Sequence, residues 1–177
     1  MQTDATASPI RRATAHDADA LSTFGRRAFS ETFAGDNTPA DLEKYLNSAF
    51  SPQIQRAELE QAGLTCLMME RDGAVLAYAM IQTGANSPHV SDPTAAELRR
   101  FYVDRTAHGT GVAQTLMDSC IATAAESGAN TVFLGVWERN LRAIRFYEKQ
   151  GFTKVGKQVF TLGDDVQQDR VMARLLP

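Results

Sequence analysis

Two closely spaced glycines, Gly109 and Gly111, lie where the chain has the chemistry to bind a phosphate group. They separate an apolar segment typical of a strand from a longer segment with a helical apolar stripe. Glycines allow a tight turn and a close approach of backbone to ligand. The first turn of a helix presents unpaired N–H groups and the positive end of the helix dipole. A pyrophosphate suits such a place, although a tight turn without a ligand would use the same residues.

The glycine run matches neither of two common nucleotide-binding loops. A P-loop needs a glycine, four intervening residues and then Gly-Lys-Ser/Thr, and this chain has no such run. A dinucleotide fingerprint needs a third glycine or alanine at the position of Gln114, inside alternating strand–helix units. The run therefore predicts a pyrophosphate site of another kind. Its residues are His108, Gly109, Thr110, Gly111, Val112 and Ala113.

A second motif places a polar cap and a tyrosine on one helix. Asn140 precedes a helical apolar pattern, and Asn is a preferred N-cap residue. Tyr147 follows seven residues later, so it projects near the same face two turns along. Capping alone would explain Asn140, and Tyr147 has the alternative of being a half-buried aromatic with its hydroxyl in water. Together the two motifs predict a tyrosine beside the pyrophosphate site.

Apolar spacing and capping residues predict the elements that position these motifs. Helix starts are indicated by Thr14 with Asp17, by Thr38-Pro39 and by Ser51-Pro52, and Asp72-Gly73 indicates a hairpin turn. The expected helices cover residues 15–32, 39–49, 52–61, 112–127 and 140–150. The expected strands cover residues 10–13, 64–71, 74–82, 96–103, 131–136, 154–162 and 166–175. This order predicts a mixed α/β fold, with a central, mostly antiparallel twisted sheet of about seven strands and helices on both faces.

The bulk properties favour one soluble domain over residues 1–177, with a mobile tail at residues 1–8. A net charge of −3 and a pI near 5.6 argue against a nucleic-acid partner. No apolar run is long enough to span a membrane, and the first residues lack the order of a signal peptide, so a cytoplasmic location is expected. Cys66 and Cys120 lie in apolar runs typical of buried free cysteines. Three scattered histidines and two cysteines do not predict a metal site.

The two motifs, in this order, resemble those of the GNAT superfamily of acetyl-CoA-dependent N-acetyltransferases. The loop of that family reads Arg or Gln, two residues, Gly, one residue, then Gly or Ala. Here His108 takes the place of Arg or Gln, so we expect an altered side-chain contact without loss of the coenzyme. The resemblance extends from Ile10 to Leu176. The later family signature is matched by Asn140, Ala143, Phe146, Tyr147, Lys149, Gly151 and Phe152.

The resemblance implies acetyl-CoA as co-substrate, without a metal. Backbone N–H groups of the loop are expected to bind the pyrophosphate, and the strand that ends at Val103 to pair with the pantetheine amides. The Val103 N–H is expected to stabilise the oxyanion. The residues expected to contact the coenzyme are Phe101, Tyr102, Val103, His108, Gly109, Thr110, Gly111, Val112, Ala113, Asn140 and Tyr147.

Two catalytic roles follow from the resemblance. Tyr147 is expected to protonate the departing thiolate, because a phenol keeps its proton at neutral pH. Glu97 is expected to act as general base, directly or through water. Strand alternation would direct Glu97 and Val103, six residues apart, to one face. The alternative for Glu97 is a strand-end carboxylate paired with Arg99 or Arg100.

The acceptor is expected to be the primary amine of a small molecule. Residues 31–60, 101–103 and 160–173 are similar to the PaiA-type spermidine/spermine acetyltransferases, which favours a polyamine. Residues 29–41 with Tyr45 are the expected acceptor wall, and Trp137 and Glu138 are expected to border it. The acids Glu31, Asp36 and Asp41 would attract a polyamine or simply face water.

Other functions remain open from the sequence. The alternative acceptors are a protein N-terminus, a lysine or an antibiotic. The chain would otherwise be a regulatory module that binds acetyl-CoA without turnover, although Asn140 and Tyr147 together favour turnover. Members of the family are often dimers, so a homodimer is expected, without a membrane partner.

Overall fold

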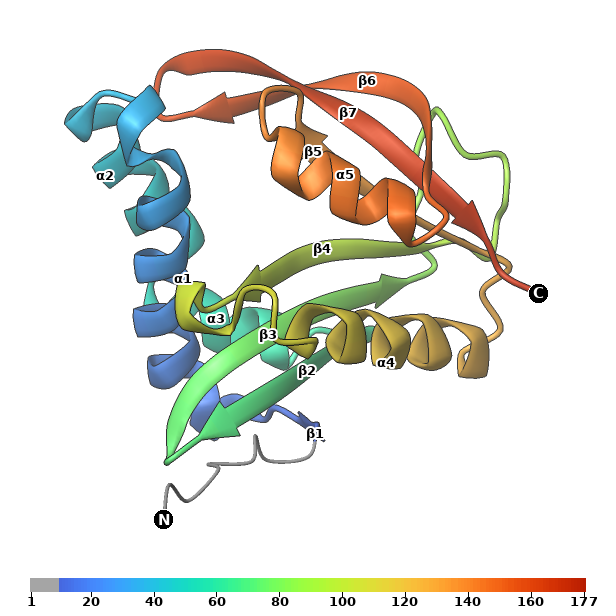
Figure 1. The fold of residues 1–177 in the computed structure, drawn as a ribbon, viewed down its shortest axis with the longest axis horizontal. Helices are drawn as coiled ribbons and strands as arrows, with labels where there is room; N and C mark the ends of the chain where they lie inside the picture. Colours follow the sequence, from blue (N-terminus) through green and yellow to red (C-terminus); the bar gives the residue numbers. More distant parts are fainter. Residues whose placement is uncertain (1–9) are drawn as a thin grey trace.

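The computed structural model describes residues 10–177, and it has a seven-stranded sheet at its centre (Figure 1). The strand order is β1-β2-β3-β4-β5-β7-β6, and every neighbouring pair is antiparallel except β4 with β5. This confirms the expected mixed α/β fold; the predicted tail lies outside the described residues. The strands are β1 (Arg11–Arg12), β2 (Leu64–Arg71), β3 (Ala74–Thr83), β4 (Ala96–Val103), β5 (Thr131–Trp137), β6 (Thr153–Leu162) and β7 (Asp165–Leu175).

Local capping chemistry sets the starts of the first helices. The reciprocal contacts of Thr14 and Asp17 open a short 3-10 turn, so the first α-helix starts three residues later than expected. The Thr38 hydroxyl accepts a hydrogen bond from the Asp41 N–H at 3.2 Å, and Ser51 caps the next helix in the same way. The helices are α1 (Ala18–Phe33), α2 (Pro39–Ala49), α3 (Pro52–Leu59), α4 (Val112–Glu126) and α5 (Leu141–Lys149).

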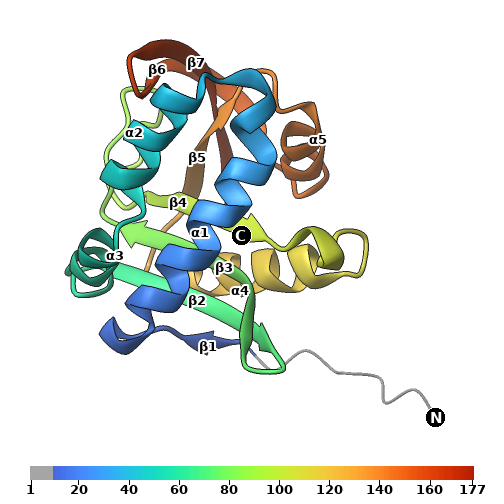
Figure 2. The same ribbon diagram turned by 90° about the vertical axis from the view of Figure 1, so that its left-hand side faces the viewer.

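Helices cover both faces of the sheet, because successive side chains of each strand point to opposite sides. Tyr78 and Met80 of β3 pack with Leu21 and Phe24 of α1. The intervening residues of β3 pack with α4 on the other face. Figure 2 shows α2 and α3 on one side of the strands and α4 and α5 on the other. Among the described residues, no helix is long and apolar enough to cross a membrane.

The parallel pair β4–β5 opens the sheet at its middle. The two strands pair only at Ala96 with Val132 and at Glu97 with Phe133. Beyond these positions they diverge, and the antiparallel unit β5-β7-β6 carries α5 away from α4 (Figure 1). The last part of β4, residues 98–103, therefore has β3 on one edge and no strand on the other.

A β-bulge in β4 changes which residues share a face. Met80 pairs with Arg100 and Ile81 with Leu98, so Arg99 is one residue more than β3 can match. The extra residue reverses the alternation between Glu97 and Val103, which therefore lie on opposite faces. The expectation of a shared face was wrong, because simple alternation assumes an unbroken ladder.

Candidate active site

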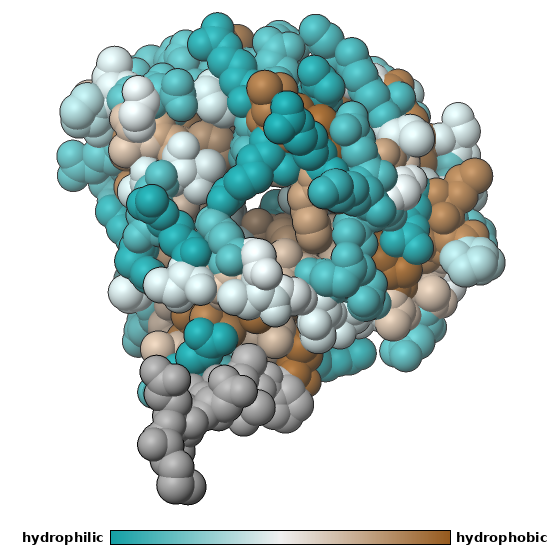
Figure 3. Space-filling view, viewed as in Figure 1, coloured by the Kyte–Doolittle hydropathy of each residue, from teal (hydrophilic) through white to brown (hydrophobic). Residues whose placement is uncertain are grey.

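One cavity of about 450 Å³ lies where β4 and β5 diverge, and it reaches from α1 to α5. The space-filling view shows a hollow near the middle of this face (Figure 3). Thr110, Gly111 and Val112 of the expected site do not line the cavity, and Val112 is instead buried in the core. The expected residues that do line it are Glu97, Phe101, Tyr102, Val103, His108, Gly109, Ala113, Asn140 and Tyr147.

The glycine loop leads into the first turn of α4 and leaves its backbone open. Gly109 and Gly111 have φ of +76° and +89°, a region that L-residues other than glycine rarely adopt. A Cβ built on either one meets no atom within 4 Å, so open space adjoins this backbone. Gly111 is the N-cap of the 15-residue helix α4 and has no side chain to occupy the first N–H groups. With Ala113 of the first turn lining the cavity, the loop fits a pyrophosphate.

The open edge of β4 presents backbone groups to the cavity. The Asp104 N–H donates to the Leu76 carbonyl at 2.9 Å, so the directly opposite pair 76–104 is hydrogen-bonded. Because such pairs alternate along an antiparallel ladder, the N–H groups of Phe101 and Val103 point away from β3. Tyr102 points its backbone groups toward β3. Of the three residues expected to pair with pantetheine, the ladder thus leaves two with free backbone groups.

His108, the departure from the family loop, lies between the strand end and α5. Its Nε2 lies 3.2 Å from the Val103 carbonyl oxygen, and its Nδ1 lies 2.6 Å from Nη1 of Arg142. The neutral tautomer with a proton on Nε2 satisfies both contacts, since Arg142 can only donate. Arg142 lines the cavity and was missed from the sequence. A cation in the first turn of a helix interacts unfavourably with the helix dipole. The position of an arginine there was the sequence feature that could have indicated a role for Arg142.

Asn140 and Tyr147 occupy the expected positions on α5. The Asn140 side-chain oxygen accepts a hydrogen bond from the Ala143 N–H at 3.2 Å, so the predicted N-cap is confirmed. The Tyr147 ring packs edge-on against Phe101 and Phe152, with centroids 6.3 and 5.9 Å apart. Burial raises the pKa of Tyr147 above its ordinary value, so the phenol keeps its proton at neutral pH.

Glu97 lines the cavity without an ion-pair partner among the described residues. The alternative pairing with Arg99 or Arg100 does not occur, because both arginines bind Glu58, at 3.5 and 3.0 Å. Burial raises the pKa of Glu97, and the nearby charge of Arg99 partly opposes this effect. A raised pKa makes a carboxylate a better proton acceptor near neutral pH.

The acceptor side of the cavity is more aromatic than the sequence suggested. Phe29, Phe33, Tyr45 and Trp137 line it as expected, but Glu31, Asp36, Asp41 and Glu138 do not. Asp41 has another task, since its carboxylate accepts the Asp164 N–H at 2.7 Å and ties α2 to the β6–β7 turn.

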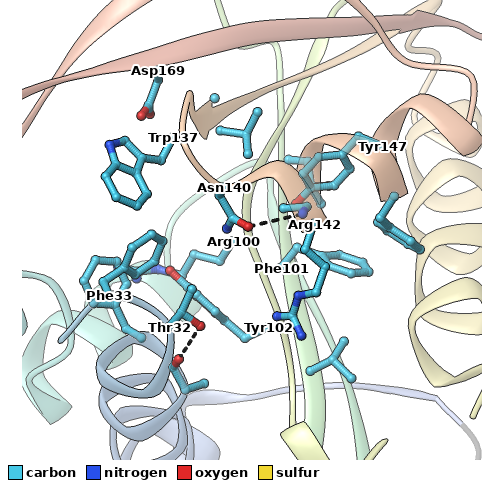
Figure 4. A pocket seen from close by; sticks show the side chains of 18 of the residues that line it. Thr32, Phe33, Arg100, Phe101, Tyr102, Trp137, Asn140, Arg142, Tyr147 and Asp169 are labelled. Carbon is cyan, nitrogen blue, oxygen red and sulfur yellow. Dashed lines mark hydrogen bonds between the residues drawn. The ribbon is translucent and has the colours of Figure 1, made fainter. Parts of the chain in front are cut away.

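The sequence also missed Asp169 of β7, whose carboxyl group lies in the cavity. Its side chain is only 7 % exposed. Burial raises the pKa of Asp169 to about 6, and a contact with Gln158 partly opposes this rise. Asp169 lies two residues before the buried Val171 on one strand, so the two side chains share a face. This spacing was the sequence feature that could have indicated a buried acid. Figure 4 shows Asp169, Trp137 and Phe33 on one side of the cavity and Tyr147 on the other.

The described residues contain no group of three or more side chains that could bind a metal.

Comparison with known proteins identifies the family of this chain. An uncharacterized N-acetyltransferase of Mycobacterium bovis is 34% identical over 160 residues, covering 90% of this chain and 98% of that protein. Another, from Lactobacillus delbrueckii subsp. lactis, is 29% identical over 153 residues, covering 86% and 88%. The PaiA N-acetyltransferase of Thermoplasma acidophilum, solved with coenzyme A, has a similar fold, with a TM-score of 0.78 and 19% identity over 97% and 99% of the two chains. Residues 27–152 match the acetyltransferase (GNAT) family, and the chain therefore belongs to that family.

Proposed function

We propose that this GNAT N-acetyltransferase moves the acetyl group of acetyl-CoA to a primary amine of a small molecule. The observation that carries the proposal is the single cavity shared by the helix start at Ala113, the β4 edge, Tyr147 and an aromatic wall. The wall lines the acceptor side between α1, α2 and the strands β5, β6 and β7. A concave site that combines aromatic side chains with convergent polar groups suits a small ligand.

Acetyl transfer needs a proton acceptor and a proton donor, and we assign these roles to Glu97 and Tyr147. Acetyl-CoA supplies a thioester carbonyl, which the neutral amine nitrogen attacks while the carbon–sulfur bond breaks. Glu97, directly or through water, accepts the proton that the substrate ammonium must lose. The Val103 N–H donates to the carbonyl oxygen as negative charge develops on it. Tyr147 donates a proton to the departing sulfur, and the attacking nitrogen returns one to Tyr147 as the amide forms. The products are the acetylated amine, the free thiol and the one proton that Glu97 accepted.

A polyamine is one acceptor of this class. The likeness to the PaiA-type branch supports it, and the structural neighbour from Thermoplasma acidophilum bears that name. Surface attraction by Glu31, Asp36 and Asp41 does not support it, because none of these residues lines the cavity.

The test is release of free thiol from acetyl-CoA with a panel of amines: diamines, polyamines, amino acids, an aminoglycoside and a lysine peptide. Saturable turnover with small amines is expected. In Tyr147→Phe, kcat should fall about 100-fold, the usual size of general acid catalysis, while the KM for acetyl-CoA changes less than about threefold.

Two results would count against the proposal. Binding of acetyl-CoA without turnover of any amine would favour the regulatory module. Turnover restricted to the lysine peptide would favour a macromolecular acceptor. An unchanged kcat in Tyr147→Phe, with circular dichroism like wild type, would remove Tyr147 from the mechanism.

A further inference from the structure

We infer that Asp169 binds a cationic nitrogen of the acceptor, distinct from the nitrogen that is acetylated. The acceptor is then a diamine, or an amine with a second positive group beyond an apolar spacer. The inference rests on the proposed function and adds to it the residue that selects the substrate.

The first argument is that Asp169 is a buried acid without a protein counter-ion. None of the ion pairs between described residues includes it, although it is only 7 % exposed. Burial of an ionised carboxyl group is costly unless a cation or several donors compensate. The pKa of about 6 shows that Gln158 alone does not compensate. A ligand cation would supply the missing partner.

The second argument is that the surroundings leave room for such a ligand. Asp169 pairs across the strands with Trp137 of β5 and with Gln158 of β6. Gly135 lies on the same face of β5, and a Cβ built there would come 3.2 Å from the Asp169 carboxylate and 2.5 Å from the Gln158 amide nitrogen. The absence of a side chain at Gly135 thus lets Gln158 and the acid pack against this backbone. The room for a ligand is the cavity itself, which Gly135, Gln158 and Asp169 all line.

Aromatic rings continue from this acid along the wall of the cavity. Trp137 packs on Phe33 at 5.7 Å between centroids, Phe33 on Phe29 at 4.4 Å, and Phe29 on Tyr45 at 4.7 Å. Aromatic faces attract ammonium groups and pack well against methylene chains. An alkyl spacer along this wall would end with its cation at Asp169.

The third argument is that Asp169 lies apart from the place of acetyl transfer. Tyr147 packs in the same core cluster as Leu134 and Val136, on the α5 face of the sheet. Asp169 points to the opposite face, with Trp137 (Figure 4). The nitrogen that reacts beside Tyr147 and the β4 edge is therefore not the nitrogen at Asp169. Because ordinary amines titrate near pH 10, the second nitrogen is cationic at neutral pH.

The experiment compares two acceptors of equal length, 1,5-diaminopentane and 1-aminopentane, in wild type and in Asp169→Asn. Loss of one charge-assisted contact should lower kcat/KM for the diamine about 10- to 100-fold and leave the monoamine within about threefold. Asp165→Asn is the matched control, because Asp165 is an exposed acid on the same strand and outside the cavity. Asp165→Asn should leave kcat/KM for both acceptors at the wild-type values.

Trp137 supplies a readout that does not need turnover. It is the only tryptophan of the chain and lies directly across from Asp169. Diamine binding should change its fluorescence saturably in wild type, and the half-saturating concentration should rise about 10- to 100-fold in Asp169→Asn.

The outcomes separate the inference from the proposed function. Saturable diamine binding that requires Asp169, with no acetylation, would support the inference and defeat the proposed function. If both acceptors are acetylated, and Asp169→Asn lowers kcat/KM equally for the two or for neither, the inference is overturned and the proposed function stands.

Discussion

Replacement of Asp169 by Asn should change the pH dependence of stability. In the folded state burial raises the pKa of Asp169 from its ordinary 3.8 to about 6, so the folded protein holds this proton more tightly than the unfolded chain. The resulting stability is fully present below about pH 4 and is lost as the pH rises through 6. Asn does not titrate, so the variant does not show this loss of stability. Between pH 4 and 7 the free energy of unfolding of the variant should therefore rise relative to that of wild type.

The size of the gain follows from the two pKa values. A rise from 3.8 to about 6 corresponds to about 3 kcal/mol of unfolding free energy. Screening by solvent reduces this value, so we expect a gain of about 1 to 3 kcal/mol. Tyr45 of α2 and Glu97 of β4 share the cavity with Asp169, and Arg139 lies 6.0 Å from the centre of the Trp137 ring. These groups are present in both proteins, so most of their contribution cancels in the difference.

Urea unfolding at intervals from pH 4 to 8, extrapolated linearly to water, measures the gain. Any loss of packing in the variant shifts its stability equally at each pH and does not affect the slope of the difference. Asp165→Asn, at an exposed acid outside the cavity, is the control. A difference for Asp169→Asn that is constant within about 0.5 kcal/mol would refute the reasoning, because Asp169 would then titrate as an exposed acid does.

Two further predictions test the glycine loop and the ion pair of Arg100. Ala113→Trp should weaken acetyl-CoA binding at least about 100-fold by calorimetry, because Ala113 lines the cavity in the first turn of α4. Asp118→Trp, at an exposed position of the same helix, should leave the affinity unchanged, and equal affinities of the two variants would show that the pyrophosphate does not bind at this loop. Glu58→Gln should cost about 3 kcal/mol in urea unfolding, because it leaves the buried Arg100 charge without its carboxylate partner. Lys44→Ala, which removes the surface pair with Asp164, should cost less than about 1 kcal/mol, and equal losses would contradict the burial argument.

Features set by neighbouring residues could be predicted from the sequence. The Asp72-Gly73 turn has two positive φ angles, 52° and 78°, as the two-residue hairpin requires. Asn140 caps α5, and Gly111 adopts the left-handed conformation that begins α4. Each depends on chemistry within a few residues, so the spacing of residue types is sufficient to indicate it. The two family motifs are local in the same way.

Features set by strand pairing could not be predicted. The bulge at Arg99 arises where β4 meets β3, and it moved Glu97 to the face opposite Val103. Pairing also decided that the N–H groups of Phe101 and Val103, but not that of Tyr102, point away from β3. The partner of Arg99 and Arg100 is Glu58, some 40 residues earlier, and no local pattern indicates that choice.

The sequence by itself therefore determined the family, the glycine loop before α4 and the position of the tyrosine on α5, because each depends on a short run of residues and on local backbone geometry. The tertiary structure alone decided which residues line the other side of the cavity. Its aromatic wall comes from α1, α2, β5 and β6, and its acid from β7, elements spread over about 140 residues of chain. Distance through space decides which charges are buried together, so only the folded chain shows that Asp169, rather than the surface acids of α1 and α2, faces the cavity.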